Sequence, residues 1–102
     1  MMKYTVTNNY SDANMTGLVG YVTTTYADLV ETFGKPQIGG DKTNSEWIIK
    51  FADGEVATIY DWKMPETPVF DYEWHIGGNN SKVVERVAKA IGVGNNCWSI
   101  DR

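Results

Sequence analysis

The stretch "EWIIKFADGEVATIYDW", Glu46 to Trp62, decides the fold because it holds two β-rich runs on either side of Asp53-Gly54. This dipeptide favours the tight turns that join antiparallel strands, so the sequence predicts a hairpin; if its turn is of type I′, both residues have positive φ. Side chains alternate between the two faces of a strand. In the first strand, Trp47, Ile49 and Phe51 lie on the same face. In the second strand, Val56, Thr58, Tyr60 and Trp62 lie on one face, and Ala57, Ile59 and Asp61 lie on the other. Because apolar groups occupy both faces, we expect the hairpin to lie in the centre of a sheet.

Shorter strand patterns lie on either side of this hairpin. At the amino end, residues 3–7 ("KYTVT") and 18–23 ("LVGYVT") are β-prone runs separated by turn-forming residues, and we expect them to pair as a first hairpin. After a proline-containing loop, residues 72–76 ("YEWHI") resume as a strand, and residues 95–100 are expected to add a last short one. The strand over 72–76 puts Tyr72, Trp74 and Ile76 on one side and Glu73 and His75 on the other.

Two segments, residues 25–34 and 81–92, show the 3.6-residue periodicity of amphipathic helices. The expected buried stripes are Tyr26, Leu29, Val30 and Phe33 in the first helix and Val84, Val87, Ala88 and Ile91 in the second. The expected end signals are Thr25 with Asp28 and then Gly34 for the first helix, and Asn80 or Ser81 and then Gly92 for the second.

These elements predict a single α+β domain over residues 1–102. Its antiparallel sheet is expected to have about five or six short strands built from hairpins, packed against two amphipathic helices. A parallel sheet is disfavoured, because the connections between strands are too short for crossovers. A chain of 102 residues has room for one domain and buries roughly two thirds of the surface that it exposes when unfolded.

Charge and composition exclude several classes of function. The net charge of -4 speaks against binding a nucleic-acid polymer, which requires clustered Lys and Arg. Charged residues make up 22% of the chain and interrupt the apolar runs, so we expect neither a signal peptide nor a membrane anchor. We therefore expect the protein to be located in the cytoplasm. One His and one Cys cannot build a structural zinc site, and the carboxylates follow no calcium-loop pattern, so no metal or cofactor is expected.

A second stretch, "EWHIGGNNSK" from Glu73 to Lys82, contains the only histidine of the chain and connects a strand to a helix. The backbone N–H groups of its glycines, asparagines and serine lie at a helix N-terminus, where a phosphate or carboxylate binds well, and a tryptophan could stack on a base. The spacing matches neither glycine-rich phosphate motif, and a plain strand-to-helix turn also needs Gly and Asn. The candidate ligand-binding residues are Trp62, Trp74, His75, Gly77, Gly78, Asn79, Asn80, Ser81 and Lys82.

An enzymatic role for His75 would require a partner. The candidates that surround it in the sequence are Ser81, Cys97, Asp61, Asp71 and Glu73. They show no nucleophile elbow and no ligand spacing, so no catalytic residue is assigned. Four Trp and six Tyr, in contrast, exceed what so small a core can bury, and exposed rings stack on bases or anchor protein interfaces. The sequence therefore favours a binding protein over an enzyme.

The pieces "EWIIKFADGEVATIYDWK" and "EWHIGG", followed by a Val-rich helix, resemble a group of small proteins of unassigned function encoded by bacteriophages. The resemblance spans about residues 46–91 and carries over no catalytic residue. It implies a setting, because small acidic early phage proteins often act by binding, either blocking a host enzyme or sequestering a signalling molecule.

We therefore expect a non-enzymatic, phage-type binding protein that acts against host defence by sequestering a phosphorylated or cyclic nucleotide in the host cytoplasm. The alternative is a protein-protein inhibitor that docks on a host defence enzyme through the face or edge of the central ribbon, and a hydrolase that uses His75 is third. A homo-oligomer is left open. A nucleotide binder should bring Trp faces, backbone donors and a cation into one concavity, whereas an inhibitor should expose a flat aromatic or acidic patch.

Overall fold

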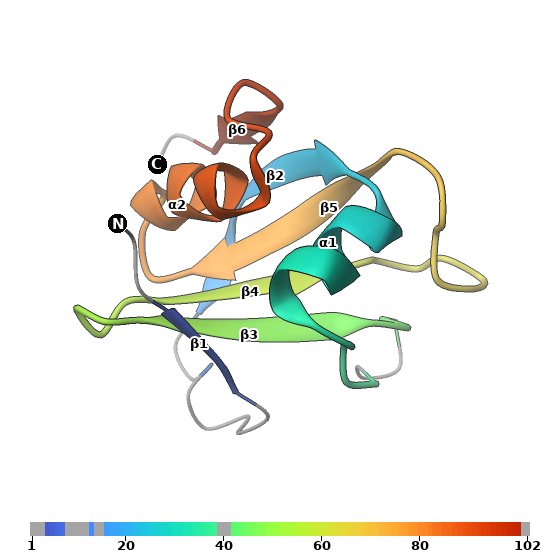
Figure 1. Cartoon of the computed structure of the whole chain (residues 1–102), viewed down its shortest axis with the longest axis horizontal. Coiled ribbons are helices and arrows are strands. Elements are labelled where there is room, and N and C mark those ends of the chain that lie inside the picture. The colour runs from blue at the N-terminus through green and yellow to red at the C-terminus, as the bar shows by residue number, and fades with distance from the viewer. Residues whose placement is uncertain (1–3, 8–12, 14–15, 39–41, 101–102) are drawn as a thin grey trace.

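The computed structural model describes residues 4–7, 13, 16–38 and 42–100, and these form six strands and two helices. In chain order the elements are β1 (Tyr4–Thr7), β2 (Gly17–Thr24), α1 (Tyr26–Phe33), β3 (Glu46–Phe51), β4 (Val56–Tyr60), β5 (Tyr72–Gly78), α2 (Lys82–Ile91) and β6 (Cys97–Ser99). The strands form one antiparallel sheet in the order β1-β3-β4-β5-β2-β6, and both helices pack against the same face of it (Figure 1). The predicted α+β class is confirmed.

The central hairpin of β3 and β4 is formed as predicted, and its turn is longer than a type I′ turn. The Phe51 N–H donates to the Glu55 carbonyl at 2.8 Å and the Gly54 N–H to the Phe51 carbonyl at 2.9 Å, which makes a three-residue loop over 52–54. Gly54 has a φ of 93°, whereas Asp53 is not among the described residues with positive φ. The turn is therefore not of type I′, because in the longer loop Gly54 adopts a positive φ and Asp53 does not.

Replacement of Gly54 by Ala is expected to lower the free energy of unfolding by about 1 kcal/mol, because an L side chain strains a backbone with positive φ. A Cβ at this position meets no atom within 4 Å, so the loss comes from the backbone and not from a clash. Gly94→Ala is the matched control, since its Cβ also meets no atom within 4 Å and its φ is not positive. Urea unfolding compares the two variants, and equal stability would contradict the expectation.

The expected first hairpin between the two amino-terminal strands is wrong. β1 pairs with β3, with Tyr4 opposite Phe51, while β2 pairs with β5 and β6 on the other side of the sheet. The Tyr4 ring meets Phe33 and Phe51 edge-on, at centroid distances of 5.3 and 6.3 Å. The connection between β1 and β2 is too long to impose a tight turn, so burial of Tyr4 against the two phenylalanines decides where β1 pairs.

The ends of the helices follow the predicted capping signals. At the start of α1 the Asp28 N–H donates to Thr25 Oγ1 at 3.1 Å, and a glycine with positive φ ends each helix. At the start of α2 the Lys82 N–H donates to Asn80 Oδ1 at 2.9 Å, whereas the Ser81 side chain makes no capping hydrogen bond. Of the two expected caps, Asn80 therefore supplies the acceptor.

The hydrophobic core lies between the helices and one face of the sheet. Trp47 and Trp74 meet edge-on there, with ring centroids 5.6 Å apart, and both are almost completely buried. Trp47 Nε1 donates to the Gly34 carbonyl at 2.8 Å, and Trp74 Nε1 to the Thr24 carbonyl at 3.2 Å. Around them lie Val22, Leu29, Phe33, Ile49, Phe51, Ala57, Ile59, Ile76, Val83, Val84, Val87 and Ala88. The opposite face of the sheet is covered by neither α1 nor α2 (Figure 1).

A polar network joins the loop of the central hairpin to α2. Arg86 Nη1 lies 2.9 Å from Asp53 Oδ2 and 2.8 Å from Glu55 Oε1, and the Asn80 side chain donates to the same Glu55 carboxylate. The Arg86 guanidinium lies over the Phe51 ring, 4.0 Å from its centroid. The hydrogen bond from Arg86 also lowers the pKa of the Asp53 carboxyl. The turn before α2 therefore has a structural role in holding the hairpin.

Candidate ligand site on the open face of the sheet

The face of the sheet that points away from the helices carries a row of side chains across five strands. In order from β3 to β6, the register aligns Glu46, Tyr60, His75, Tyr21 and Trp98. Directly opposite residues share one face, so these side chains form a continuous line, which we call the open-face row. At its end the Trp98 Nε1 donates to the Glu73 carboxylate at 2.9 Å.

His75 lies in the middle of the open-face row, surrounded by aromatic rings. Its ring stacks on Tyr60 with centroids 5.4 Å apart and meets Tyr21 edge-on at 5.0 Å. Trp62 and Tyr72 each lie 6.4 Å away. His75 Nδ1 is buried and has no hydrogen-bond partner among the described residues. These contacts make His75 part of an aromatic cluster.

Burial lowers the pKa of the His75 imidazole below its ordinary value of 6.5, although the nearby Glu73 and Asp61 carboxylates act in the opposite direction. The imidazole is therefore neutral at pH 7. A neutral imidazole is buried among the Tyr and Trp rings at a lower desolvation cost than an imidazolium would be. Any positive charge for an anionic ligand must come from elsewhere on this face.

We expect the folded state to lose stability as the pH falls from about 7 to 5, because the unfolded chain binds a proton at His75 more readily than the folded one. The variant His75→Gln should lose part of this dependence when the melting temperature is measured across the range. Burial raises the pKa of the Glu46 carboxyl, so the folded chain binds this proton more readily than the unfolded chain and gains stability as the pH falls. Glu46→Gln removes this gain and should therefore make the loss of stability with falling pH steeper. An unchanged slope for His75→Gln would show that His75 titrates normally.

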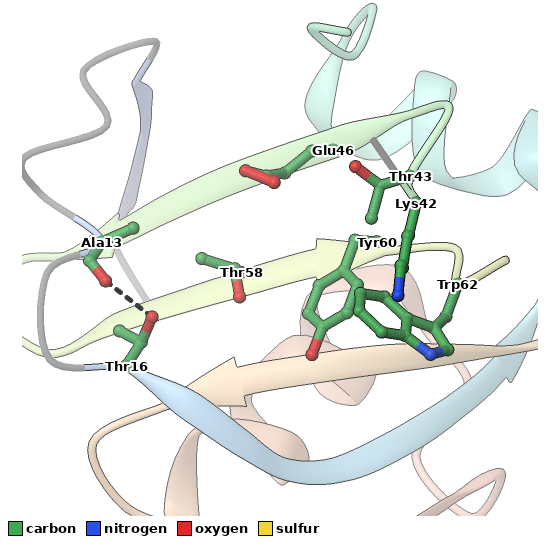
Figure 2. Close-up of a pocket in the computed structure, with 8 residues that line it drawn as sticks. All are labelled: Ala13, Thr16, Lys42, Thr43, Glu46, Thr58, Tyr60 and Trp62. Carbon is green, nitrogen blue, oxygen red and sulfur yellow. Dashed lines mark hydrogen bonds between the residues drawn. The ribbon is translucent and has the colours of Figure 1, made fainter. Parts of the chain in front are cut away.

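Two neighbouring hollows lie over this face. The first, of about 540 Å³, is lined by Thr43, Glu46, Thr58, Tyr60 and Trp62, with Lys42 at one end and Ala13 and Thr16 at the other (Figure 2). Figure 2 shows Glu46 and Thr43 along one side of it, and the Lys42 ammonium beside the rings of Tyr60 and Trp62. The second hollow, of about 450 Å³, is lined by Leu18, Tyr21, Tyr60, Trp62 and His75. Tyr60 and Trp62 therefore belong to both.

Two lysines lie beside the Trp62 ring, and one of them, Lys42, lines the first hollow. Lys42 Nζ lies 5.8 Å from the centroid of the Trp62 ring, and Lys63 Nζ lies 5.9 Å from it. Trp62 is 43% exposed, so part of the indole is open to a ligand. An exposed ring beside two ammonium groups suits a planar molecule that carries negative charge.

Asp61, which precedes Trp62 in the chain, has a buried carboxylate that accepts hydrogen bonds from the segment next to Lys42 and Thr43. Its oxygens accept from the Asn44 N–H at 2.7 Å, from Asn44 Nδ2 at 2.8 Å and from the Ser45 N–H at 3.1 Å. The Lys63 N–H donates to the Lys42 carbonyl at 2.7 Å, which ties the same two segments together. These hydrogen bonds hold the backbone on either side of Trp62 close to the backbone of residues 42–45.

The structure divides the site residues that the sequence predicts between two faces and one end of the sheet. Trp62 and His75 lie on the open face, and a Cβ on Gly77 would meet Thr58 Oγ1 there. Trp74 is 0% exposed in the core on the opposite face, so its expected role as a stacking surface is wrong: its indole is enclosed by core residues.

The remaining predicted residues, Gly78 to Lys82, lie at the end of β5 beside α2. Gly77 and Gly78 both pair with β2 and with β4, so their backbone groups belong to the sheet and are not free for an anion. Asn79 and Ser81 are exposed, and Asn80 contacts the Glu55 carboxylate, which would repel a phosphate. Anion binding at this turn stays a prediction, with less support than the open face.

Within the described residues, neither Ser81 nor Cys97 is placed to act as a nucleophile with His75. Among the described residues, no hydrogen bond links its ring to Ser81, Cys97 or Asp61. Burial raises the pKa of the Cys97 thiol, which disfavours the thiolate needed for attack. These observations give the hydrolase alternative no geometric support.

Several residues of the open face are missing from the sequence-based site. Glu46, Tyr60 and Tyr21 belong to recognised strands, and alternation correctly places Tyr60 with Thr58 on the face opposite Ile59, but it does not indicate which face is open. Lys42 and Thr43 lie in a connection without periodicity, so no sequence signal marks them.

No protein-family model, curated protein or solved structure matches the chain. Within the described ranges, neither helix is long and apolar enough to cross a membrane.

Proposed function

We propose that this protein binds a planar, negatively charged small molecule of the nucleotide class in the first hollow of its open sheet face. The observation that carries the proposal is the placement of Trp62, Tyr60 and the Lys42 ammonium around one concavity. A base can stack on the rings, and a phosphate can lie against the ammonium groups of Lys42 and Lys63. Stacking on aromatic rings and local cations are the usual means of holding a nucleotide.

The overall charge makes the two lysines important. A protein with a net charge of -4 repels an anion at long range, so local compensation is required for binding. Lys42 lines the hollow, and both ammonium groups lie close to the Trp62 ring, at 5.8 and 5.9 Å from its centroid. This arrangement supports one phosphate-bearing ligand bound in a fixed direction.

The biological setting belongs to the same proposal. The resemblance to small bacteriophage proteins supports a role in the cytoplasm of an infected host, where sequestering a phosphorylated nucleotide signal would counter host defence. Such a role requires that the ligand is held without being chemically changed. It therefore fits a site without an activated nucleophile.

Thermal unfolding with a panel of linear and cyclic nucleoside monophosphates tests the proposal. A ligand at a hundred times its dissociation constant adds about 2.7 kcal/mol of stability, which raises the melting temperature of a domain this size by about 10 °C. A flat response across the panel would exclude the proposed function.

Two matched pairs of variants locate the site. Lys42→Ala should weaken binding of the responding nucleotide, whereas Lys82→Ala, at the first residue of α2, should not. Trp62→Ala should abolish the response, and Trp98→Ala, which removes a 50% exposed indole outside the hollow, should preserve it. The reverse result for the lysine pair would move the site to the turn.

A second candidate, docking on a host protein, is favoured by exposed apolar groups between β4 and β5. Val69 is 74% exposed and Phe70 is 58% exposed, on the same connection as Trp62. Such residues serve as anchors in protein interfaces. If no nucleotide binds and a Phe70→Ser variant loses capture of a defence enzyme, this candidate replaces the first.

A further inference from the structure

The side chain of Glu46 is a carboxylate placed among apolar and hydroxyl groups. It lies on β3, directly opposite Tyr60, and lines the first hollow. Burial raises the pKa of its carboxyl. Within the described part of the chain, no residue donates a hydrogen bond to this carboxylate or forms an ion pair with it. Its oxygens are not among the buried atoms that lack a partner, so they face the hollow, where the donor of a ligand can replace water.

The position of Glu46 relative to the rings fixes which part of a ligand it can reach. Glu46 lies directly opposite Tyr60, with Cβ atoms about 5 Å apart, and Figure 2 shows its carboxylate directed toward the Ala13 end of the hollow, away from Lys42. Figure 2 shows Glu46 along the side of the hollow, while Lys42 and Trp62 lie at its end. A base that covers the rings, with its phosphate toward the lysines, presents an edge to Glu46.

We infer that Glu46 reads this edge and makes the hollow selective for a guanine-type base, an inference that rests on the proposed function. An ionised carboxylate is an acceptor with two oxygens in one plane. Guanine presents two adjacent donors, N1–H and the exocyclic N2–H, which match the two oxygens. Adenine presents an unprotonated N1 at the same place, so its lone pair would face the carboxylate.

Thr43 supports the same choice of base. Its Oγ1 is buried and has no hydrogen-bond partner among the described residues, and it lines the hollow on the side that carries Glu46 (Figure 2). A hydroxyl donates readily to a carbonyl oxygen, and guanine carries such an oxygen at C6, next to N1. Because Thr43 Oγ1 is buried, the side chain has to rotate about χ1 before its hydroxyl can donate to this oxygen, whereas the Glu46 carboxylate already lines the hollow.

Isothermal titration with guanosine, inosine and adenosine 5′-monophosphates tests the inference. A bidentate contact to a base discriminates by about tenfold to a hundredfold, so the guanine nucleotide should bind that much more tightly than the adenine nucleotide. Inosine keeps N1–H and loses N2–H, and should bind with intermediate affinity. In Glu46→Gln the preference for guanine over adenine should fall to about threefold or less.

The controls separate failure of this inference from failure of the proposed function. Glu31→Gln removes an exposed carboxylate from α1, on the other face of the sheet, and should keep the guanine preference. If all three nucleotides bind equally, or if Glu46→Gln keeps the preference, the base-reading role is excluded while the nucleotide site remains. If none binds, the proposed function and this inference fall together.

Discussion

Trp74→Ala is expected to lower the free energy of unfolding by about 3–5 kcal/mol, a large share of the total for a domain of this size. The indole is 0% exposed, meets Trp47 edge-on and donates to the Thr24 carbonyl. Its removal leaves a cavity between the sheet and the helices and deprives that carbonyl of its donor. Chemical unfolding followed by circular dichroism measures the loss, and a melting temperature well below that of the parent is the expected readout.

Trp62→Ala is the matched control, because it removes the same side chain from the open face. Trp62 is 43% exposed, so its truncation should cost about 1 kcal/mol or less. The two variants therefore separate structure from binding: the first should lose stability, and the second should lose only the response to nucleotides. Equal losses of stability would mean that the indole of Trp62 is as important for packing as that of Trp74.

Asp61→Ala is expected to be the second severe substitution, with a loss of about 3 kcal/mol. Asp61 is 0% exposed and accepts three hydrogen bonds from Asn44 and Ser45. The alanine would leave buried N–H groups without acceptors, and each such group costs about 1–3 kcal/mol. Because these bonds fix the segment that carries Lys42 and Thr43, nucleotide binding should fall as well.

Asp71→Ala is the control for Asp61→Ala, since Asp71 is an exposed aspartate and its truncation should change stability by less than about 0.5 kcal/mol. Asp61→Asn retains one carbonyl oxygen as an acceptor and should fall between the two. Urea unfolding of the three variants gives the order. If Asp61→Ala were as stable as Asp71→Ala, the hydrogen bonds to Asp61 would contribute nothing measurable to the fold.

The sequence predicts the elements well because the periodicity of side chains reports which face of an element is buried. Alternation along residues 46–60 and the helical stripe over 26–33 follow from burial on one or both faces. The same periodicity does not predict which strands pair, because a strand shows the same alternation of apolar and polar residues whichever strand lies beside it. β1 shows this: its pairing depends on contacts of Tyr4 with Phe33 and Phe51, which are distant in sequence.

The candidate site was harder to predict, because a residue type does not report which side of the sheet it occupies. The alternation of Trp74 and His75 along one strand already separates them onto opposite faces, so both could not contact one ligand. Burial then decides that Trp74 belongs to the core. Lys42 reaches Trp62 only because Asp61 holds the two connections together, and no local pattern contains that information.

The position of β2 in the sheet has a consequence for the folding rate. β2 is paired on one side with β5, about fifty residues later in the chain, whereas β3 and β4 form a local hairpin. Pairing over such separations slows folding, so we expect a time constant of milliseconds to seconds, with β2 joining last. Val22→Ala should then accelerate unfolding and leave the folding rate nearly unchanged in stopped-flow measurements. Because Tyr21 arrives with β2, a ligand that contacts it should slow unfolding without accelerating folding.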